Sequence, residues 1–323
     1  MTRSCCVLCP FCGVLAWVDG PDLWFYGGRT MTDAALHVVT GAFGYTGKYI
    51  SRELLSRGVW VRTLTNSLHR ENPFGGAVEV HPLDFTDHAA LVESLRGAAV
   101  LHNTYWVRYD HRSGTRDFGY DLAVRNTRTL FECAREAGLE RVVHVSVANA
   151  SEDSDWGYFR GKALLEKDLR ASGLSYVIVR PTVIFGRPEN VLINNIAWLL
   201  RHLPVFGLFG RGDYRLTPIH VDDLAGICAD AADGETNLTL NAVGPETLTY
   251  RQMIHQMAHA MGLYRLIVPL PDSVSLLAGR ALGLFLNDII LTRHEISGLR
   301  DELMYTGTEP LGTTSFTDWL HQG

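Results

Sequence analysis

Tyr158 and Lys162 stand four residues apart in the stretch Y-F-R-G-K-A-L-L-E, which is predicted to be helical. Residues i and i+4 of a helix share one face, so the phenol and the ammonium are expected to be neighbours. A nearby positive charge lowers the pKa of a phenol because it favours the phenolate. A tyrosine in this setting can pass a proton during a reaction. The alternative is a surface pair on an amphipathic helix.

Three glycines, Gly41, Gly44 and Gly47, follow an apolar strand in V-V-T-G-A-F-G-Y-T-G-K and lead into a predicted helix. Glycine lets a ligand approach the backbone N–H groups, and a helix N-terminus carries a partial positive charge. A strand before such a triplet and a helix after it favour binding of a dinucleotide diphosphate. The predicted contacts are Gly41, Phe43, Gly44, Tyr45, Thr46 and Gly47. The alternative is a tight turn that packs the helix on the strand, without a ligand.

The end of the second predicted strand bears on the choice of cofactor. An NAD site usually places an acidic residue there, which binds the ribose 2′-hydroxyl. This chain has Thr65-Asn66-Ser67, with His69 and Arg70 close behind. A cation suits a 2′-phosphate, so NADP is favoured over NAD, with Asn66 and Arg70 as contacts. After the third strand come Asp84 and Phe85, also predicted cofactor contacts, Asp84 accepting from the adenine amino group unless it is a helix cap.

The segment up to about residue 187 supplies the elements that position these residues. Short β-branched runs alternate with helical stretches, which is typical of βαβ units and a parallel sheet. The predicted strands are 36–40, 59–64, 77–82, 98–103, 141–147 and 175–180, and the predicted helices are 46–57, 88–96, 117–136 and 158–172. This order predicts an α/β fold with a Rossmann-type doubly wound parallel sheet.

Residues 31–187 are expected to form this NAD(P)-binding domain, and residues 188–323 a smaller C-terminal lobe. The lobe is expected to contain a helix at 193–202, a packed apolar helix at 272–291 and a strand at about 238–243 that returns to the sheet. We expect the lobe to shape the substrate pocket, for which the candidate lining residues are Trp198, His202, Phe206, Phe209, Arg211 and His220.

Residues 1–30 are expected to be a leader outside the fold, because Met31 begins a stretch typical of the start of such a domain. The run Cys6-x-x-Cys9-x-x-Cys12 lacks the fourth ligand of an iron–sulfur motif, so no metal is predicted. The apolar stretch from Cys5 to Val18 has 14 residues, too few to span a bilayer. No integral membrane span is therefore predicted.

The chain has 323 residues, of which 46% are hydrophobic and 20% charged, and its net charge is −6. This balance is that of a globular protein, and it disfavours a nucleic-acid partner, which normally requires a basic face. Cys133 and Cys228 stand alone in apolar segments, as in proteins of a reducing compartment. The sequence thus predicts a cytoplasmic protein with a small-molecule substrate.

Five stretches together resemble the short-chain dehydrogenase/reductase superfamily, in its extended and atypical, NAD-dependent epimerase/dehydratase-like members. They are T-G-A-F-G-Y-T-G at 40, R-N-T-R-T-L at 125, the Tyr158/Lys162 pair, R-P-T-V-I-F-G at 180 and P-I-H-V-D-D-L-A at 218. The resemblance covers residues 36 to about 260. It implies that Tyr158 and Lys162 are catalytic, that Lys162 also binds the nicotinamide ribose, and that Pro181 lies near the nicotinamide. It allows a monomer or a homodimer.

One departure from the family concerns the hydroxyl that polarises the substrate carbonyl. Extended members carry it a few residues past the fifth strand, where this chain has Ala148. Ser146 is the main candidate, with Ser151, although Ser146 could instead cap the strand. Only 12 residues separate Ser146 from Tyr158, which resembles the atypical branch that includes the 39-kDa accessory subunit of respiratory complex I and redox-sensing relatives.

Members of that branch can hold a nucleotide without obvious turnover. Two functions therefore stay open. The first is an NAD(P)-dependent oxidoreductase or epimerase that acts on a small carbonyl or hydroxyl compound or a nucleotide sugar. The second is a non-catalytic NAD(P)-binding protein with a structural or redox-sensing role.

Overall fold

The computed structural model describes residues 35–107, 120–187, 190–234, 236–271, 298 and 300–322. Within them, seven parallel strands form one sheet in the order β11-β6-β5-β4-β1-β2-β3. The strands are β1 (Leu36–Thr40), β2 (Trp60–Thr65), β3 (Val78–Pro82), β4 (Val100–Asn103), β5 (Arg141–Val145), β6 (Ser175–Pro181) and β11 (Leu238–Ala242). The chain order reverses between β1 and β4, where ligands bind in doubly wound sheets.

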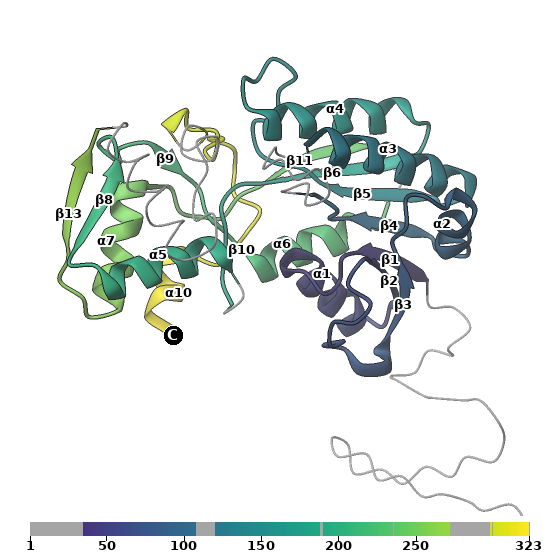
Figure 1. Cartoon of the computed structure of the whole chain (residues 1–323), viewed down its shortest axis with the longest axis horizontal. Coiled ribbons are helices and arrows are strands. Elements are labelled where there is room, and N and C mark those ends of the chain that lie inside the picture. Colours follow the sequence, from purple (N-terminus) through teal and green to yellow (C-terminus); the bar gives the residue numbers. More distant parts are fainter. Residues whose placement is uncertain are drawn as a thin grey trace, which may run out of the picture. The chain divides into compact units, whose positions relative to one another are not determined.

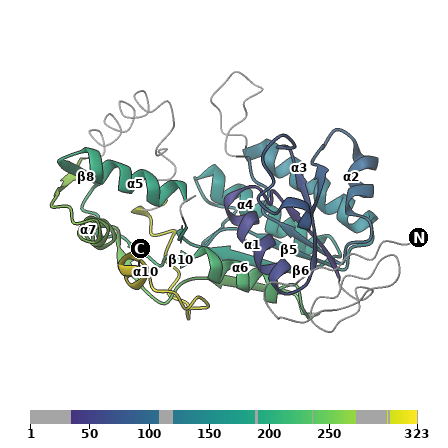
Figure 2. The ribbon, with the colours of Figure 1, turned by 90° about the horizontal axis from the view of Figure 1, so that it is seen from below.

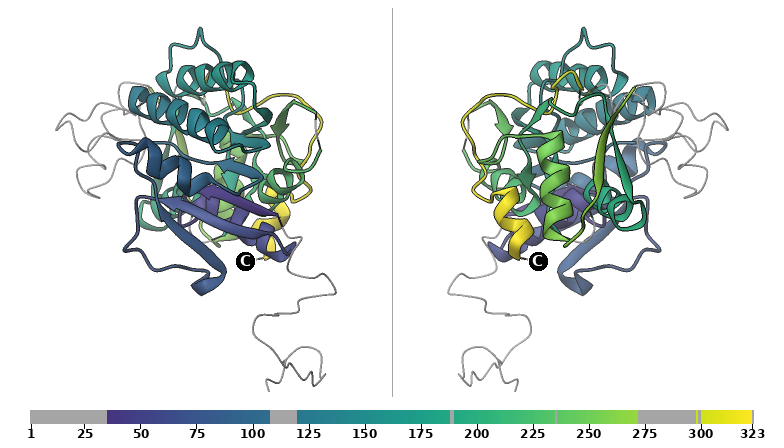
Figure 3. Two further views of the ribbon diagram at one scale, coloured as in Figure 1. Left: turned by 90° about the vertical axis from the view of Figure 1, so that its right-hand side faces the viewer. Right: turned by 90° about the vertical axis from the view of Figure 1, so that its left-hand side faces the viewer.

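Helices cover both faces of this sheet (Figure 1). One face carries α1 (Tyr45–Ser56) and α6 (Val221–Asp230), and the other carries α2 (His88–Leu95), α3 (Tyr120–Glu136) and α4 (Gly157–Ala171). Successive strand residues feed opposite cores because side chains alternate across a pleated strand. Val39 and Val143 pack with α1 and α6, whereas Val38 and Val142 pack with the other three helices. Figure 3 shows the layers from two further sides.

A smaller lobe follows β6 and has a core of its own. Its elements are α5 (Val191–His202), α7 (Tyr250–Ala260), α10 (Phe316–Gln322), and the strand pairs β7 (Ile184–Phe185) with β10 (Ile219–His220), β9 (Arg215–Leu216) with β12 (Leu248–Thr249), and β8 (Val205–Phe209) with β13 (Leu266–Leu270). Phe185, Leu208, Tyr250 and Phe316 are buried together at its centre. Figure 2 shows α5, α7 and α10 close together in this lobe.

The predicted Rossmann-type fold with a smaller C-terminal lobe is confirmed. A strand near the predicted range 238–243 does lie in the sheet, where Leu238–Ala242 pair with residues 177–181 of β6. Pro181 is the last residue of β6, whereas the sequence predicted that this strand ends at Arg180. The proposed boundary at residue 187 stays a prediction. The predicted leader 1–30, the helix 272–291 and the start of the helix 117–136 lie outside the described residues.

In the part of the chain that the structure describes, we find no helix with the length and hydropathy needed to cross a membrane.

Candidate active site

The glycine loop joins the end of β1 to the start of α1. Gly41 has a φ of +68°, a conformation that a residue with a Cβ rarely adopts. Its N–H donates to the Leu64 carbonyl at the end of β2, and its own carbonyl accepts from Gly44, both at 2.8 Å. Backbone hydrogen bonds therefore hold this turn at both ends, and it leads directly into the first turn of α1.

Side chains at Gly44 or Gly47 would crowd the backbone of this loop. A Cβ on Gly47 would stand 2.4 Å from the Gly41 carbonyl oxygen, and one on Gly44 would stand 3.2 Å from the same atom. Gly44 is the N-cap of α1, and no side chain caps that helix, whereas Asp87, Asn190 and Thr249 cap α2, α5 and α7. Gly44 is exposed, and the N–H groups in the first turn of α1 have no side-chain cap. This arrangement fits a diphosphate, which would accept hydrogen bonds from those N–H groups.

Arg70 lies beside the glycine loop. Its Nη1 donates to the Phe43 carbonyl at 3.1 Å, although the two residues are 27 positions apart. The segment after β2 thus comes back to the glycine loop, which we also call the cradle, and Asn66 is exposed at the start of this segment. In this fold a ribose 2′-phosphate would bind near the end of β2. The Arg70 guanidinium lies in the same region. The structure brings Arg70 to the loop, and the cofactor contacts of Arg70 and Asn66 both stay predictions.

Asp84 closes the turn after β3. Its Oδ1 accepts from the Thr86 N–H at 2.9 Å and from the Thr86 hydroxyl at 2.7 Å. Asp87, and not Asp84, caps α2. Phe85 packs its ring 5.0 Å from that of Tyr105, which follows β4. The adenine contact predicted for Asp84 and Phe85 stays a prediction.

Lys162 is buried on α4, with 3% of its surface exposed. Its Nζ donates to the Val145 carbonyl at the end of β5, at 2.8 Å, and stands 4.6 Å from the ring centre of Trp106. Burial lowers the pKa of Lys162 to about 7, and the negative charge of Glu166 acts in the opposite direction. Tyr158, one turn earlier, packs its ring 5.3 Å from that of Trp106. The predicted pair is therefore gathered around an indole.

Ser146 lies just past the end of β5 and is 2% exposed. Its hydroxyl donates to Glu166 Oε1 at 2.6 Å. The Glu166 carboxylate also accepts from Arg180 Nε at 2.8 Å and from Arg170 at 3.0 Å, so this buried carboxylate is the centre of a network that reaches the surface at Arg170. The single hydroxyl proton of Ser146 is used here, and Ala148 is fully buried. In this arrangement Ser146 has no hydroxyl proton left to donate to a substrate, and Ala148 has no hydroxyl at all.

Two contacts connect the glycine loop and β5 to the chain that leaves β6. The Tyr45 hydroxyl donates to the Gly186 carbonyl at 2.5 Å. The Ala148 N–H donates to the Pro181 carbonyl at 2.9 Å. The predicted cofactor residues Tyr45 and Pro181 thus lie where the sheet meets the lobe. Thr46, in the first turn of α1, is half-buried.

Residues 41–194 match a family model whose description is NAD(P)H-binding. The ceramide reductase of Caulobacter vibrioides is 30% identical over 256 residues, which cover 77% of this chain and 78% of that protein. The chain belongs to the family of NAD(P)H-binding proteins that this model describes. Within this family, the mouse mitochondrial NADH dehydrogenase [ubiquinone] 1 alpha subcomplex subunit 9 is 28% identical over 256 residues, which cover 76% of this chain and 66% of that subunit.

Two solved structures of reductases share this architecture. The Escherichia coli NADPH-dependent quinone oxidoreductase QOR2, in complex with NADPH, aligns with a TM-score of 0.71 and 20% identity, over 88% of this chain and 99% of that one. The Citrobacter triphenylmethane reductase aligns with a TM-score of 0.72 and 15% identity, over 88% and 98% of the two chains. At these identities the alignments show the fold alone.

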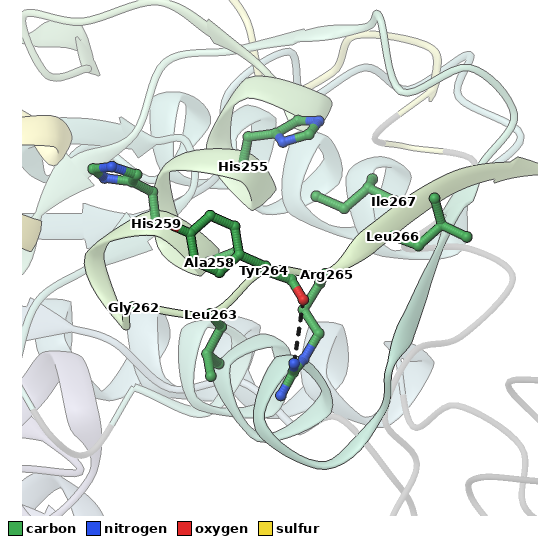
Figure 4. A pocket seen from close by; sticks show the side chains of 9 residues that line it. All are labelled: His255, Ala258, His259, Gly262, Leu263, Tyr264, Arg265, Leu266 and Ile267. Carbon is green, nitrogen blue, oxygen red and sulfur yellow. Dashed lines mark hydrogen bonds between the residues drawn. The ribbon is translucent and has the colours of Figure 1, made fainter.

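In this family member, the residues proposed to line the substrate pocket do not form one group. Trp198 and His202 stack on each other at 4.3 Å on α5. Phe206 is buried in the core of the lobe, and His220 caps α6 by accepting from the Asp222 N–H. A separate surface groove lies along the end of α7 and the start of β13 (Figure 4).

That groove is lined by His255, His259, Tyr264 and Arg265 among others, and Arg265 Nη1 donates to the Tyr264 carbonyl at 3.3 Å (Figure 4). All the predicted site residues are described by the structure, and none of them lines it. The groove is thus distinct from the Tyr158–Lys162 site.

Trp106 and Glu166 are the site residues that sequence reasoning missed. Trp106 follows β4 at the carboxyl edge of the sheet, which is where ligands bind in this fold. Glu166 stands four residues after Lys162 on the same helix face. Both signals were present in the sequence, but the direction of each side chain depends on neighbours from other elements.

Proposed function

We propose that the protein is an NAD(P)-dependent oxidoreductase or epimerase/dehydratase-like enzyme that acts on a small carbonyl or hydroxyl compound or a nucleotide sugar. The burial of Lys162 one helical turn from Tyr158 carries this proposal. Burying an ammonium is costly, and lysine is rarely buried without a partner. Groups with a strongly shifted pKa are concentrated at functional sites.

The glycine loop and the Tyr158–Lys162 pair are connected through the segment that follows β4. Thr104 donates its hydroxyl to the Thr40 carbonyl at 2.5 Å, directly before Gly41. Two residues further on, Trp106 contacts both Tyr158 and Lys162. This continuity at one edge of the sheet supports a single site that would hold a dinucleotide and a substrate together.

The proposed roles follow from these positions. The nicotinamide supplies or accepts a hydride when it is bound. The backbone of residues 41–47 would hold the diphosphate, and Tyr158 would give a proton to the substrate oxygen or take one from it. The Lys162 ammonium would favour the phenolate of Tyr158. Polarisation of the substrate by Ser146, as predicted, would require its hydroxyl to leave Glu166.

We further propose that the enzyme prefers NADP over NAD. Arg70, which lies beside the glycine loop, supports this preference, because a guanidinium binds a phosphate by charge-assisted hydrogen bonds. A thermal-shift titration with NADPH and with NADH tests it. A larger shift with NADPH is expected, and a larger shift with NADH would contradict the preference.

Replacing Tyr158 tests the enzymatic function. Tyr158→Phe keeps the ring and removes the proton, so we expect kcat in a nicotinamide-dependent screen of ketones and nucleotide sugars to fall by about 10²- to 10⁴-fold. Tyr264→Phe is the matched control, because the Tyr264 side chain is 97% exposed and lies in the surface groove. Equal rates in the wild type and in Tyr158→Phe would rule out the proposed role.

The second candidate function is a non-catalytic NAD(P)-binding protein with a structural or redox-sensing role. The engaged hydroxyl of Ser146 and the buried Ala148 favour it, as do the relatives named as NADH dehydrogenase subunits. Calorimetry separates the two candidates. Nucleotide binding without turnover of any screened substrate, in a protein whose Tyr158→Phe variant binds equally well, would support the second.

We propose that the protein works in the cytoplasm as a monomer or homodimer, on a small molecule rather than a nucleic acid. The mitochondrial location in the names of several relatives is the alternative. Light scattering after size exclusion tests the oligomeric state, and imaging of the tagged protein in its own cell tests the location. A larger hetero-complex in the native lysate would favour the structural role.

A further inference from the structure

The side chain of Lys162 lies in a site with two unlike walls. One wall is the Val145 carbonyl, 2.8 Å from Nζ, and the other is the face of Trp106, whose ring centre is 4.6 Å from Nζ. Lys162 Nζ is thus held between a carbonyl dipole and an aromatic π-face, both of which attract a cation. Trp106 comes from the segment after β4 and Val145 from the end of β5, so the two walls come from separate parts of the chain.

The surroundings of Trp106 hold its indole in this place. Gly161 makes room for it, because a Cβ at that position would stand 3.1 Å from Trp106 Cη2. The rings of Tyr120 and Tyr158 pack against the indole at 5.8 and 5.3 Å. Trp106 Nε1 is buried and makes no hydrogen bond within the described residues, so hydrogen bonding by its N–H does not explain the position. The π-face is the part of Trp106 that has a polar neighbour.

The Glu166 carboxylate only partly stabilises the positive charge of Lys162. Glu166 shares its charge among Arg180, Arg170 and the Ser146 hydroxyl, so much of its field at Lys162 is compensated. His144 on β5 is fully buried, which keeps it neutral by lowering its pKa. Within the part of the chain that the structure describes, the titratable groups found to face Lys162 or its indole are Glu166 and Tyr158 on α4, His144 on β5 and Tyr120 on α3, with Arg180 on β6 behind Glu166.

We propose that Trp106 is a positioning residue that keeps the Lys162 side chain charged, with its indole face and the Val145 carbonyl as the two halves of one cation site. This inference rests on the proposed function, in which Tyr158 needs a charged lysine beside it. It assigns Trp106 a part in proton transfer without contact with the substrate.

The scarcity of lysine allows a direct test on the protein without nucleotide or substrate. Lys48, Lys162 and Lys167 are the only lysines in the chain, so lysine labelled with ¹³C at Cε gives three signals, which Lys48→Arg and Lys167→Arg assign. The titration midpoint of the Lys162 signal is then measured by NMR in the wild type, in Trp106→Leu and in Trp106→Phe.

We expect the Lys162 midpoint to fall by about one pH unit in Trp106→Leu, which keeps an apolar cover but removes the π-face, and by less in Trp106→Phe. Trp60→Leu, at a position that is 45% exposed on β2, should leave it unchanged. A midpoint that stays constant or rises in the folded Trp106 variants would overturn the proposal, because a purely structural indole alters the melting temperature but not this midpoint. Should Trp106→Leu not fold, Trp106→Phe alone decides.

This readout is independent of turnover. A fall of the midpoint in a protein without enzymatic activity would refute the proposed function and the part of Trp106 in proton transfer, but it would confirm that the indole favours the charged form of Lys162. An unchanged midpoint in an active enzyme would support the proposed function and overturn the role of Trp106.

Discussion

The glycine loop and the Tyr158–Lys162 centre are two halves of one candidate site, but they are built from opposite materials. The loop consists of backbone, and its shape depends on side chains that are missing at Gly41, Gly44 and Gly47. The centre consists of buried side chains whose charges are balanced by neighbours from several elements. An added side chain at the glycine loop should therefore weaken nucleotide binding and stability. Removal of a side chain at the Tyr158–Lys162 centre should lower stability, because its partners lose their hydrogen bonds.

The largest effect is expected at Glu166, because its removal leaves the buried Ser146 hydroxyl and the partly buried Arg180 guanidinium without their acceptor. Glu166→Ala should lower the free energy of unfolding by about 3 kcal/mol, because Arg180 and the Ser146 hydroxyl lose their shared acceptor. Urea unfolding measures this change. Glu93→Ala is the control, since the Glu93–Arg96 pair is exposed and should contribute little. Equal effects of the two substitutions would show that the network is not what stabilises the centre.

Addition of a single methyl group tests the loop. Gly47→Ala should cost about 2 kcal/mol of unfolding free energy and at least tenfold in NADPH affinity, because its Cβ meets the Gly41 backbone at 2.4 Å. Gly226→Ala, in the interior of α6 with open space around its Cβ, should instead be neutral or slightly stabilising. Calorimetry and urea unfolding give both quantities, and unchanged affinity in Gly47→Ala would contradict the cradle.

A row of buried histidines lies beneath both halves. His37 on β1 contacts His102 on β4 at 3.1 Å, and His144 on β5 contacts Asn103 at 3.0 Å. Burial lowers the pKa of His37 to about 4, and burial also lowers the pKa values of His102 and His144 well below the usual range of a histidine. The unfolded chain therefore takes up these protons first as the pH falls below about 6.5.

The stability that these neutral histidines provide is complete above pH 6.5 and is lost as the pH falls toward 4. His37 alone should remove about 2 kcal/mol between pH 7.5 and 5, as measured by urea unfolding. His37→Gln should make the pH dependence shallower, whereas His69→Gln in an exposed loop should leave it unchanged. A pH dependence that is the same in the wild type and in His37→Gln would contradict this account.

The smallest effect is expected at Arg70, which is at the edge of the cradle. Arg70→Gln should weaken NADPH binding about tenfold and leave NADH binding nearly unchanged, because only the 2′-phosphate needs the charge. Calorimetric titration with both nucleotides gives this ratio. Equal losses for the two nucleotides would place Arg70 in support of the loop, through the Phe43 carbonyl, rather than in cofactor selection.

The fold was predictable because its signals are local. Alternating strands and helices, the Gly41–Gly47 spacing and the Tyr158–Lys162 spacing all lie within short windows of sequence, and the predicted strands differ from the observed ones by at most two residues at either end. The hydroxyl of Ser146 was less predictable. Whether it meets a substrate or a carboxylate depends on Glu166, which is 20 residues away on α4.

The sequence by itself determined the doubly wound sheet, the glycine cradle and the helix face that carries Tyr158 and Lys162, because backbone conformation and helical periodicity follow from neighbouring residues. Only the tertiary structure decided that Lys162 is buried against Trp106, that Ser146 serves Glu166 and that Arg70 returns to the Phe43 carbonyl. These contacts join separate strands and helices, and their charges and hydrogen bonds depend on which elements the packing of the sheet brings together.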